Sequence, residues 1–238
     1  MTAADPTTAR TAEQVAGNLA LALDLDDLEG ARRLARELQP WFRVAKVGLE
    51  LFSAAGPDAI EALRDLGYDV FVDLKLHDIP TTVAKASRVI GSWGAAYLTI
   101  HAVGGEPMLR AGNEAFLAGA DAAGHPSPTT LAVTVLTSDG PEAAAAVPDR
   151  VRTALAAGCG GVVCAAAEAA TARSIGSDLT ILTPGIRPAG TGADDQARPA
   201  TPEAALAAGA DLLVIGRAVT SSPDPAAAAA ALVASLVG

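Results

Sequence analysis

The stretch FVDLKLHDIPTT, residues 71–82, combines the pattern of a buried strand with a run of charged side chains. Side chains at positions i and i+2 of a strand face the same way, so Asp73 and Lys75 are expected to project together. Asp78 follows on a turn, and Pro80 ends the strand because proline cannot donate to the ladder. Charges within an apolar strand are costly to bury unless they pair. Taken alone, the stretch indicates a structural ion pair; with further charges close by, it indicates a site.

Seven other apolar runs lie along the chain, and amphipathic, alanine-rich stretches separate them. The expected strands are Leu19–Asp24, Arg43–Val47, Val70–Lys75, Ala96–His101, Leu131–Leu136, Gly161–Ala165, Leu179–Thr183 and Leu212–Gly216. The expected helices are Leu28–Leu38, Asp58–Leu66, Thr82–Ser92, Pro107–Ala118, Asp149–Ala157, Ala167–Ile175, Pro202–Ala208 and Pro225–Leu236. Eight strand-then-helix units in about 220 residues are typical of one α/β fold, the (β/α)8 or TIM barrel. A doubly wound open sheet stays the alternative, because periodicity does not show whether a sheet closes.

The chain has no linker or change of composition that would divide it into two domains. We therefore expect a single barrel domain over residues 18–238. Residues 1–17, which precede the first apolar run, are expected to form a flexible tail without a role in function.

Composition and charge exclude several classes of protein. The 238 residues contain 17 Lys and Arg against 27 Asp and Glu, a net charge of −10, and 3% are aromatic. Nucleic acid needs a basic face and, when single-stranded, aromatic side chains, so it is not an expected partner. No apolar run reaches the roughly 18 residues of a membrane span, and no secretory signal is evident, so we expect a soluble, cytoplasmic protein. Two cysteines are too few for a disulfide framework or a cysteine-based zinc site.

In such a barrel the catalytic groups lie at the carboxyl ends of the strands. Charged and polar residues occur at many of these ends: Asp24, Lys46, Asp73, Lys75, His101, Thr137 and Arg217, which follows Gly216. Lys46, Asp73, Lys75 and Asp78 make an alternating Lys–Asp–Lys–Asp set in which each charge has opposite neighbours. This convergence favours a functional site over a structural ion pair.

A second set of residues suits a phosphate group. Gly216 and Arg217 stand where the last strand enters its helix, and they offer backbone N–H groups and a guanidinium fork. Their place after the eighth strand is that of the common phosphate site of these barrels. The segment PGIRPAGTGADDQAR, residues 184–198, is long, polar and glycine-rich, which by itself is typical of a solvated surface loop.

The motif DLKLHDIPTT, residues 73–82, resembles the orotidine 5′-monophosphate (OMP) decarboxylase family. The resemblance is collinear from about Leu19 to the C-terminus and includes LALD, AKVGLELF, HAVGG, LAVTVLTS, TPGIRP, DQ and VIGRAVT. It implies a (β/α)8 homodimer with shared active sites that converts OMP to UMP and CO2 in de novo pyrimidine biosynthesis. The family uses no metal and no organic cofactor.

The resemblance also implies a role for each catalytic residue. Lys75 would donate a proton to C6 of the pyrimidine, and Asp73 would lie beside the carboxylate that leaves as CO2. Asp78 would reach the site from the other subunit. Lys46 would bridge Asp73 and the ribose, and Asp24 would accept a ribose hydroxyl.

Further substrate contacts follow from the same resemblance. The substrate-binding residues that it adds are Thr82, Thr137, Arg187, Gln196, Gly216 and Arg217. Thr137 would bond the pyrimidine amide. Residues 184–198 would form a lid, with Arg187 and Gln196 on the phosphate side, so that phosphate binding helps to close the site.

Two alternative functions stay open. The first is a magnesium-dependent sugar-phosphate decarboxylase or aldolase of the same superfamily, whose members place a metal-binding Glu where this chain has Lys46. The second is a non-catalytic barrel that binds a nucleotide monophosphate, for which the loss of one of the four charged residues would be typical. The histidines do not have metal-ligand spacing, and the roles of His77 and His101 stay open.

Overall fold

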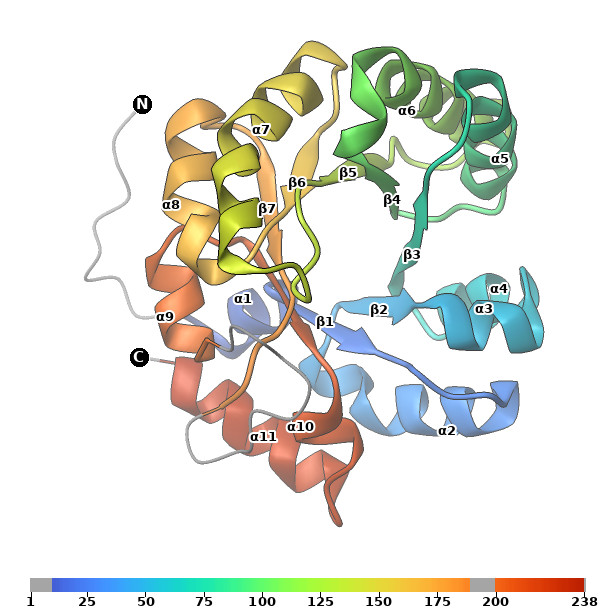
Figure 1. Cartoon of the computed structure of the whole chain (residues 1–238). Coiled ribbons are helices and arrows are strands. Elements are labelled where there is room, and N and C mark those ends of the chain that lie inside the picture. The colour runs from blue at the N-terminus through green and yellow to red at the C-terminus, as the bar shows by residue number, and fades with distance from the viewer. Residues whose placement is uncertain (1–9, 189–199, 238) are drawn as a thin grey trace.

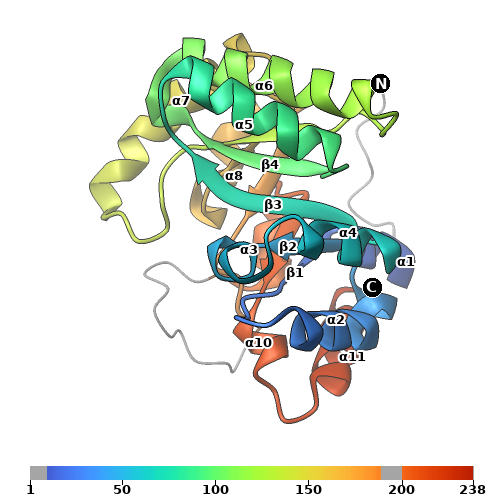
Figure 2. The same cartoon turned by 90° about the vertical axis from the view of Figure 1, so that its right-hand side faces the viewer.

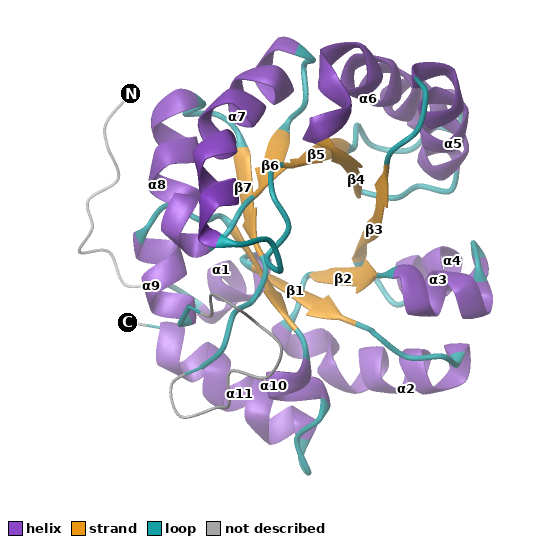
Figure 3. Cartoon of the chain, viewed as in Figure 1, coloured by secondary structure: helices purple, strands orange, loops and turns teal. Residues whose placement is uncertain are grey.

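The computed structural model, which describes residues 10–188 and 200–237, is a closed barrel of eight parallel strands in sequential order. The strands are β1 (Leu19–Ala22), β2 (Val44–Val47), β3 (Asp69–Leu76), β4 (Tyr97–His101), β5 (Thr129–Val133), β6 (Gly161–Val163), β7 (Thr180–Thr183) and β8 (Leu212–Ile215). Figures 1 and 3 show the strands as a ring with the helices outside it. The expected TIM barrel is confirmed, and the open sheet is excluded because β1 pairs with β8.

Helices follow the strands and cover the outer face of the barrel. They are α2 (Leu28–Leu38), α3 (Leu49–Ala55), α4 (Asp58–Asp65), α5 (Pro80–Ser92), α6 (Gly105–Ala122), α7 (Val147–Ala156), α8 (Ala166–Ile175), α9 (Pro202–Ala207), α10 (Arg217–Thr220) and α11 (Pro225–Leu236). Short 3-10 helices are η1 (Gln39–Trp41), η2 (Ala102–Gly104) and η3 (Pro141–Ala146). No helix within residues 10–188 and 200–237 has both the length and the apolar character that a membrane crossing requires.

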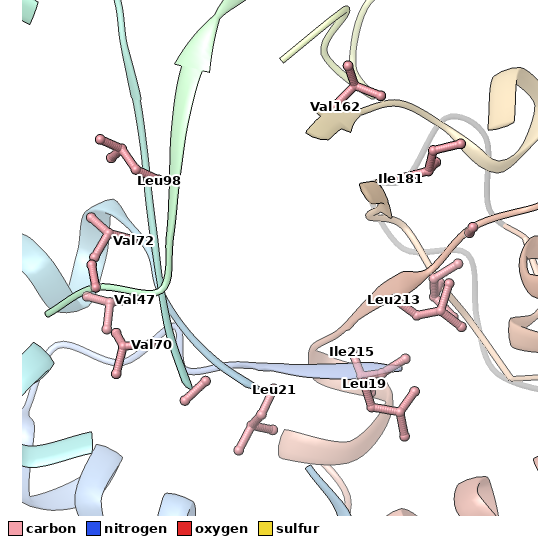
Figure 4. Packing of buried hydrophobic residues seen from close by; sticks show 14 of the residues in the cluster. Leu19, Leu21, Val47, Val70, Val72, Leu98, Val162, Ile181, Leu213 and Ile215 are labelled. Atoms are coloured by element: carbon pink, nitrogen blue, oxygen red, sulfur yellow. The ribbon is translucent and has the colours of Figure 1, made fainter. Parts of the chain in front are cut away.

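Alternation along the strands produces two apolar layers. Outward-facing residues, ten of which Figure 4 labels, fill the space between the strands and the helices. Inward-facing residues fill the barrel itself: Ala20, Val44, Phe71, Leu131, Val133, Val163, Leu182 and Leu212. Full burial of one such Val, Leu or Phe side chain contributes about 1.5–3 kcal/mol. The barrel interior below its mouth is therefore packed with apolar side chains.

The start of the barrel differs from the expectation that residues 1–17 form a tail. Residues 1–9 lie outside the described part, but Ala12–Gly17 form a helix, α1, with a capping box made by Thr11 and Gln14. Val15 of this helix is fully buried. Figure 2 shows α1 at the end of the barrel where the strands begin. Residues 12–17 are ordered because the burial of Val15 attaches this helix to the core at that end of the barrel.

Candidate active site

A cavity of about 660 Å³ lies at the carboxyl ends of the strands. The expected site residues that line it are Asp24, Lys46, Asp73, Lys75, Thr137, Arg187, Gly216 and Arg217. They come from the ends of β1, β2, β3, β5, β7 and β8 or from the segments that follow them. The barrel thus brings together groups that are up to 193 positions apart in the sequence (217 − 24).

Four charged side chains form a continuous row along one side of this cavity. Lys46 Nζ donates to Asp24 Oδ1 at 2.8 Å and lies 4.0 Å from Asp73 Oδ2. Lys75 Nζ donates to both oxygens of Asp73, at 2.8 and 2.9 Å. The Lys46 and Asp73 side chains are only 9% and 14% exposed, so each depends on its neighbours to offset the loss of hydration. Asp24 is 57% exposed and stands at the open end of the row.

The backbone of β3 departs from regular strand geometry where the row is built. Val72 pairs with Leu98 of β4, but the next pair joins Leu76 to Ile100, so the register shifts between them. Lys75 has a φ of +50° and is the one non-glycine residue with positive φ in the described chain. Such a conformation costs about 1–3 kcal/mol, and surrounding contacts must hold it. The irregularity turns the Lys75 side chain back onto Asp73.

Thr99 of β4 is a site residue that the sequence analysis did not identify. Its hydroxyl donates to Asp73 Oδ1 at 2.9 Å and accepts the backbone N–H of Lys75, also at 2.9 Å. It is 1% exposed and is absent from the described cavity lining. A signal was available, because Thr99 is a polar residue two positions before His101 on a strand whose alternate residues face the barrel interior.

Two predicted residues do not line the cavity, and a third lies outside the described part of the chain. The Asp78 side chain accepts the backbone N–H of Ile79 at 2.7 Å and is exposed. Thr82, in the first turn of α5, is also exposed, and neither residue lines the cavity. Gln196 lies outside the described residues.

Two arginines that follow β7 and β8 also line the cavity. Arg217 is the first residue of α10, and Gly216 is its N-cap residue. Arg187, which follows β7, is only 8% exposed. Arg217 is exposed. A buried and an exposed arginine beside a cavity of this size suit a dianionic ligand group, because a guanidinium fork matches the oxygens of a phosphate.

The two histidines at the ends of β3 and β4 lie next to each other and do not line the cavity. The ring centroids of His77 and His101 are 5.7 Å apart at an interplanar angle of 50°. Burial lowers the pKa of His101, and the positive charge of Lys75 and Arg150 acts in the same direction. His101 is therefore neutral at physiological pH, as befits a packed strand-end histidine.

No group of three or more His, Cys, Asp or Glu side chains within residues 10–188 and 200–237 is arranged to hold a metal ion. Cys159 and Cys164 are free and buried. Burial raises the pKa of both thiols to about 12, so neither provides a thiolate nucleophile near neutral pH.

Comparisons with known proteins show which family this chain resembles. Residues 17–232 match the model of a family described as "Orotidine 5'-phosphate decarboxylase / HUMPS family". Orotidine 5'-phosphate decarboxylase of Thermobifida fusca (strain YX) is 49% identical over 234 residues, which cover 93% of this chain and 97% of that protein. The protein of the same name from Moorella thermoacetica is 44% identical over 228 residues, covering 91% of this chain and 90% of that protein.

Solved structures show the same likeness. The crystal structure of orotidine 5'-phosphate decarboxylase from Lactobacillus acidophilus has a TM-score of 0.79 to this chain at 34% identity, and covers 92% of this chain and 99% of that one. The corresponding structure from Pyrococcus horikoshii OT3 has a TM-score of 0.76 at 25% identity, with coverages of 92% and 99%. With matches that span nearly the whole chain in sequence and in structure, this protein belongs to the orotidine 5'-phosphate decarboxylase / HUMPS family.

Proposed function

We propose that this protein decarboxylates OMP to UMP and CO2, a step of de novo pyrimidine biosynthesis. The observation that carries the proposal is the Asp24–Lys46–Asp73–Lys75 row inside a cavity that Arg187 and Arg217 also line. The row offers an ammonium donor beside a carboxylate, and the arginines offer a phosphate subsite. Relatives at 41–49% identity bear the name orotidine 5'-phosphate decarboxylase, which supports the same substrate.

In the proposed reaction, the bond between C6 and the substrate carboxylate breaks and leaves its electron pair on C6. The Lys75 ammonium donates a proton to that carbon, and Lys75 regains a proton from solvent after UMP forms. An ammonium held against a developing carbanion stabilises the transition state more than the ground state, which is the condition for catalysis. Asp73 Oδ1 holds this ammonium at 2.8 Å. Asp73 would also stand beside the substrate carboxylate, and the repulsion between the two carboxylates would end when CO2 leaves.

The rest of the cavity supplies binding. Asp24 and Lys46 would contact the ribose, and Thr137 would hydrogen-bond the pyrimidine amide. Arg187 and Arg217, with the backbone N–H groups after Gly216, would bind the phosphate. Gln196, expected on the phosphate side, lies outside the described residues and stays a prediction. Distant phosphate contacts of this kind can fix the pyrimidine against Lys75 before the reaction begins.

We infer that the active form is a homodimer in which Asp78 and Thr82 complete the site of the partner subunit. The support is that both residues lie at the mouth end of the barrel but outside its own cavity. The side chains of Ile79 and Val103 nearby are 66% and 54% exposed, which is unusual for large apolar residues without a covering surface. A two-fold contact is reciprocal, so each subunit would lend Asp78 to the other.

Two observations argue against the alternative functions. A magnesium-dependent sugar-phosphate enzyme needs oxygen ligands, whereas Lys46 places an ammonium between Asp24 and Asp73. A barrel that only binds a nucleotide would have no need of a lysine held in a strained backbone conformation beside a carboxylate, as Lys75 is. We also infer a cytoplasmic location, which the two free thiols support, because disulfides prevail in oxidising compartments.

The test of this proposal is to follow the ultraviolet absorbance of OMP with the purified full chain. The expected result is loss of OMP with formation of UMP and CO2 in equal amounts. The rate should survive exhaustive EDTA treatment and should not rise with added magnesium. Strict dependence on a divalent ion, or turnover of a sugar phosphate instead of OMP, would assign the protein to the other branch of the family.

A further inference from the structure

Thr99 lies at the only position of β4 that faces the irregular part of β3 in the described chain. The register between the strands shifts between Val72 and Leu76, so Asp73–Lys75 together lie opposite Thr99 alone. Two of these three residues carry the charged groups of the site. A single side chain of β4 is therefore placed to control the geometry of both.

The Thr99 hydroxyl uses both of its hydrogen-bonding capacities on this segment. It donates its proton to Asp73 Oδ1 and accepts the backbone N–H of Lys75, each at 2.9 Å. A hydroxyl has one proton and two lone pairs, so the two bonds are compatible. Because Thr99 is only 1% exposed, water would not replace either hydrogen bond if the hydroxyl were removed.

These two bonds fix the relative placement of the carboxylate and the ammonium. Asp73 Oδ1 accepts from Thr99 and from Lys75 Nζ, so its rotation is restricted from two sides. The Lys75 backbone has a φ of +50°, a conformation that persists only where other contacts hold it. Without the hydroxyl, the partly buried Lys75 N–H would lose its hydrogen-bond partner, and β3 would gain by relaxing toward the regular ladder.

We propose that Thr99 is a positioning residue, which holds Asp73 and Lys75 in the arrangement that the reaction requires without touching the substrate. It is absent from the described cavity lining, so its effect passes through the two residues it bonds. The inference rests on the proposed function, because the rate it alters is that of OMP decarboxylation. A positioning role of this kind affects kcat, whereas the ribose and phosphate contacts that set binding stay in place.

The test compares Thr99→Val with Thr130→Val. Valine nearly keeps the shape of threonine and replaces the hydroxyl with a methyl group. Thr130, on the neighbouring strand β5, is also 1% exposed, and its hydroxyl is without a hydrogen-bond partner in the described structure, which makes it a matched control. Thr99→Val should lower kcat by about 10- to 100-fold, the effect of losing one hydrogen bond to a charged group. Its KM for OMP and its Kd for UMP should stay within about threefold of the wild-type values, and Thr130→Val should retain wild-type kcat.

A second pair of variants keeps the inference testable if Thr99→Val does not fold. Thr99→Ser retains the hydroxyl and loses a methyl group, whereas Thr99→Ala loses both. Serine should therefore keep kcat within about threefold of wild type, and alanine should fall at least about tenfold below serine. Thermal unfolding of all four variants separates loss of folded protein from loss of rate.

The outcomes are distinct. Loss of kcat in Thr99→Val or Thr99→Ala, with rescue by serine and unchanged UMP binding, supports the positioning role. Equal kcat for the serine and alanine variants, or equal losses for Thr99→Val and Thr130→Val, would overturn it while the wild type still turns over OMP. Absence of turnover by the folded wild type would overturn the proposed function and this inference together.

Discussion

The two ends of the barrel both carry buried or half-buried ion pairs, but they use them differently. At the end where the strands begin, Arg173 donates to Asp211 at 2.5 Å and to the carbonyls of Ser177 and Leu179 at 2.6 and 2.8 Å. Asp211 in turn accepts the backbone N–H of Ile181 at 2.7 Å. These charges hold the chain in place, since each of them also bonds backbone groups of neighbouring segments.

At the mouth, by contrast, the ammonium groups donate to side chains beside a cavity. Lys46 bonds Asp24, and Lys75 bonds Asp73, all four of which line the space where a substrate would sit. A charge whose partner is a side chain at the cavity wall can exchange that partner for a ligand. The comparison separates charges that stabilise the fold from charges that are available for chemistry, and variants at each end test this separation.

The largest effect is expected at Lys75. Lys75→Ala removes the proton donor and should lower kcat by about 10⁴-fold, at the upper end of what general acid catalysis contributes. UMP should still bind, because Lys46, Arg187 and Arg217 are untouched. Rates from OMP absorbance and UMP affinity from calorimetry measure both quantities. Near-normal turnover would show that another group protonates C6.

Mixing two inactive variants tests whether the mouth is shared between subunits. Lys75→Ala and Asp78→Ala chains should each be nearly inactive alone. In a heterodimer one site has both defects and the other has native Lys75 and native Asp78. Free exchange makes half of the dimers mixed, so activity should return to about a quarter of the wild-type value. If native mass spectrometry shows exchange and activity does not rise, Asp78 acts within its own subunit.

A smaller effect is expected at the phosphate side of the cavity. Arg217→Ala removes a guanidinium that we expect to bind the phosphate, and should lower kcat/KM by about 100-fold. The loss should be smaller with a substrate that lacks the phosphate group, since that substrate does not use the arginine. Equal losses with both substrates would assign Arg217 a structural role.

The smallest effect is expected for the exposed pair at the other end. The side chains of Arg43 and Asp69, which are 2.9 Å apart, are 63% and 43% exposed. Solvent screens such a pair, so Asp69→Asn should change the free energy of unfolding by less than about 1 kcal/mol and leave kcat unchanged. Urea unfolding and the OMP assay measure the two values. A large loss of unfolding free energy or of kcat would mean that the exposure of an ion pair at this end does not predict how much the pair contributes.

The sequence predicts the repeat of the barrel and most of the mouth because both depend on local patterns. Alternation within strands places Asp73 and Lys75 on one face, and the position of Arg217 after the last strand places it at the same end of the barrel. Closure of the sheet does not follow from periodicity, since it depends on pairing between β1 and β8 across the whole chain. Several expected strands are longer than the observed ones. The first was expected to end at Asp24, but β1 ends at Ala22, because the polar residues at the mouth of the barrel leave the hydrogen-bonded ladder and face the cavity.

The remaining differences have a common cause in tertiary contacts. α3 (Leu49–Ala55) was not predicted, because seven residues after a glycine give too short a periodic pattern. α1 was expected to be flexible, yet burial of Val15 orders it. The positive φ of Lys75 and the two bonds of Thr99 depend on the register of two strands, which the sequence of either strand alone does not specify.

The same substitution at both ends gives the most direct test of the central claim, that the mouth performs chemistry and the opposite end holds the fold. Asp73→Asn and Asp211→Asn each remove one charge and keep the side-chain shape. At a temperature where both variants are folded, the account predicts that Asp73→Asn lowers kcat for OMP by at least about 10³-fold, while Asp211→Asn stays within about threefold of wild type. Asp211→Asn should instead lower the free energy of unfolding by about 1–3 kcal/mol, because it weakens a charge-assisted bond to the backbone. Comparable losses of kcat in the two folded variants would contradict the account.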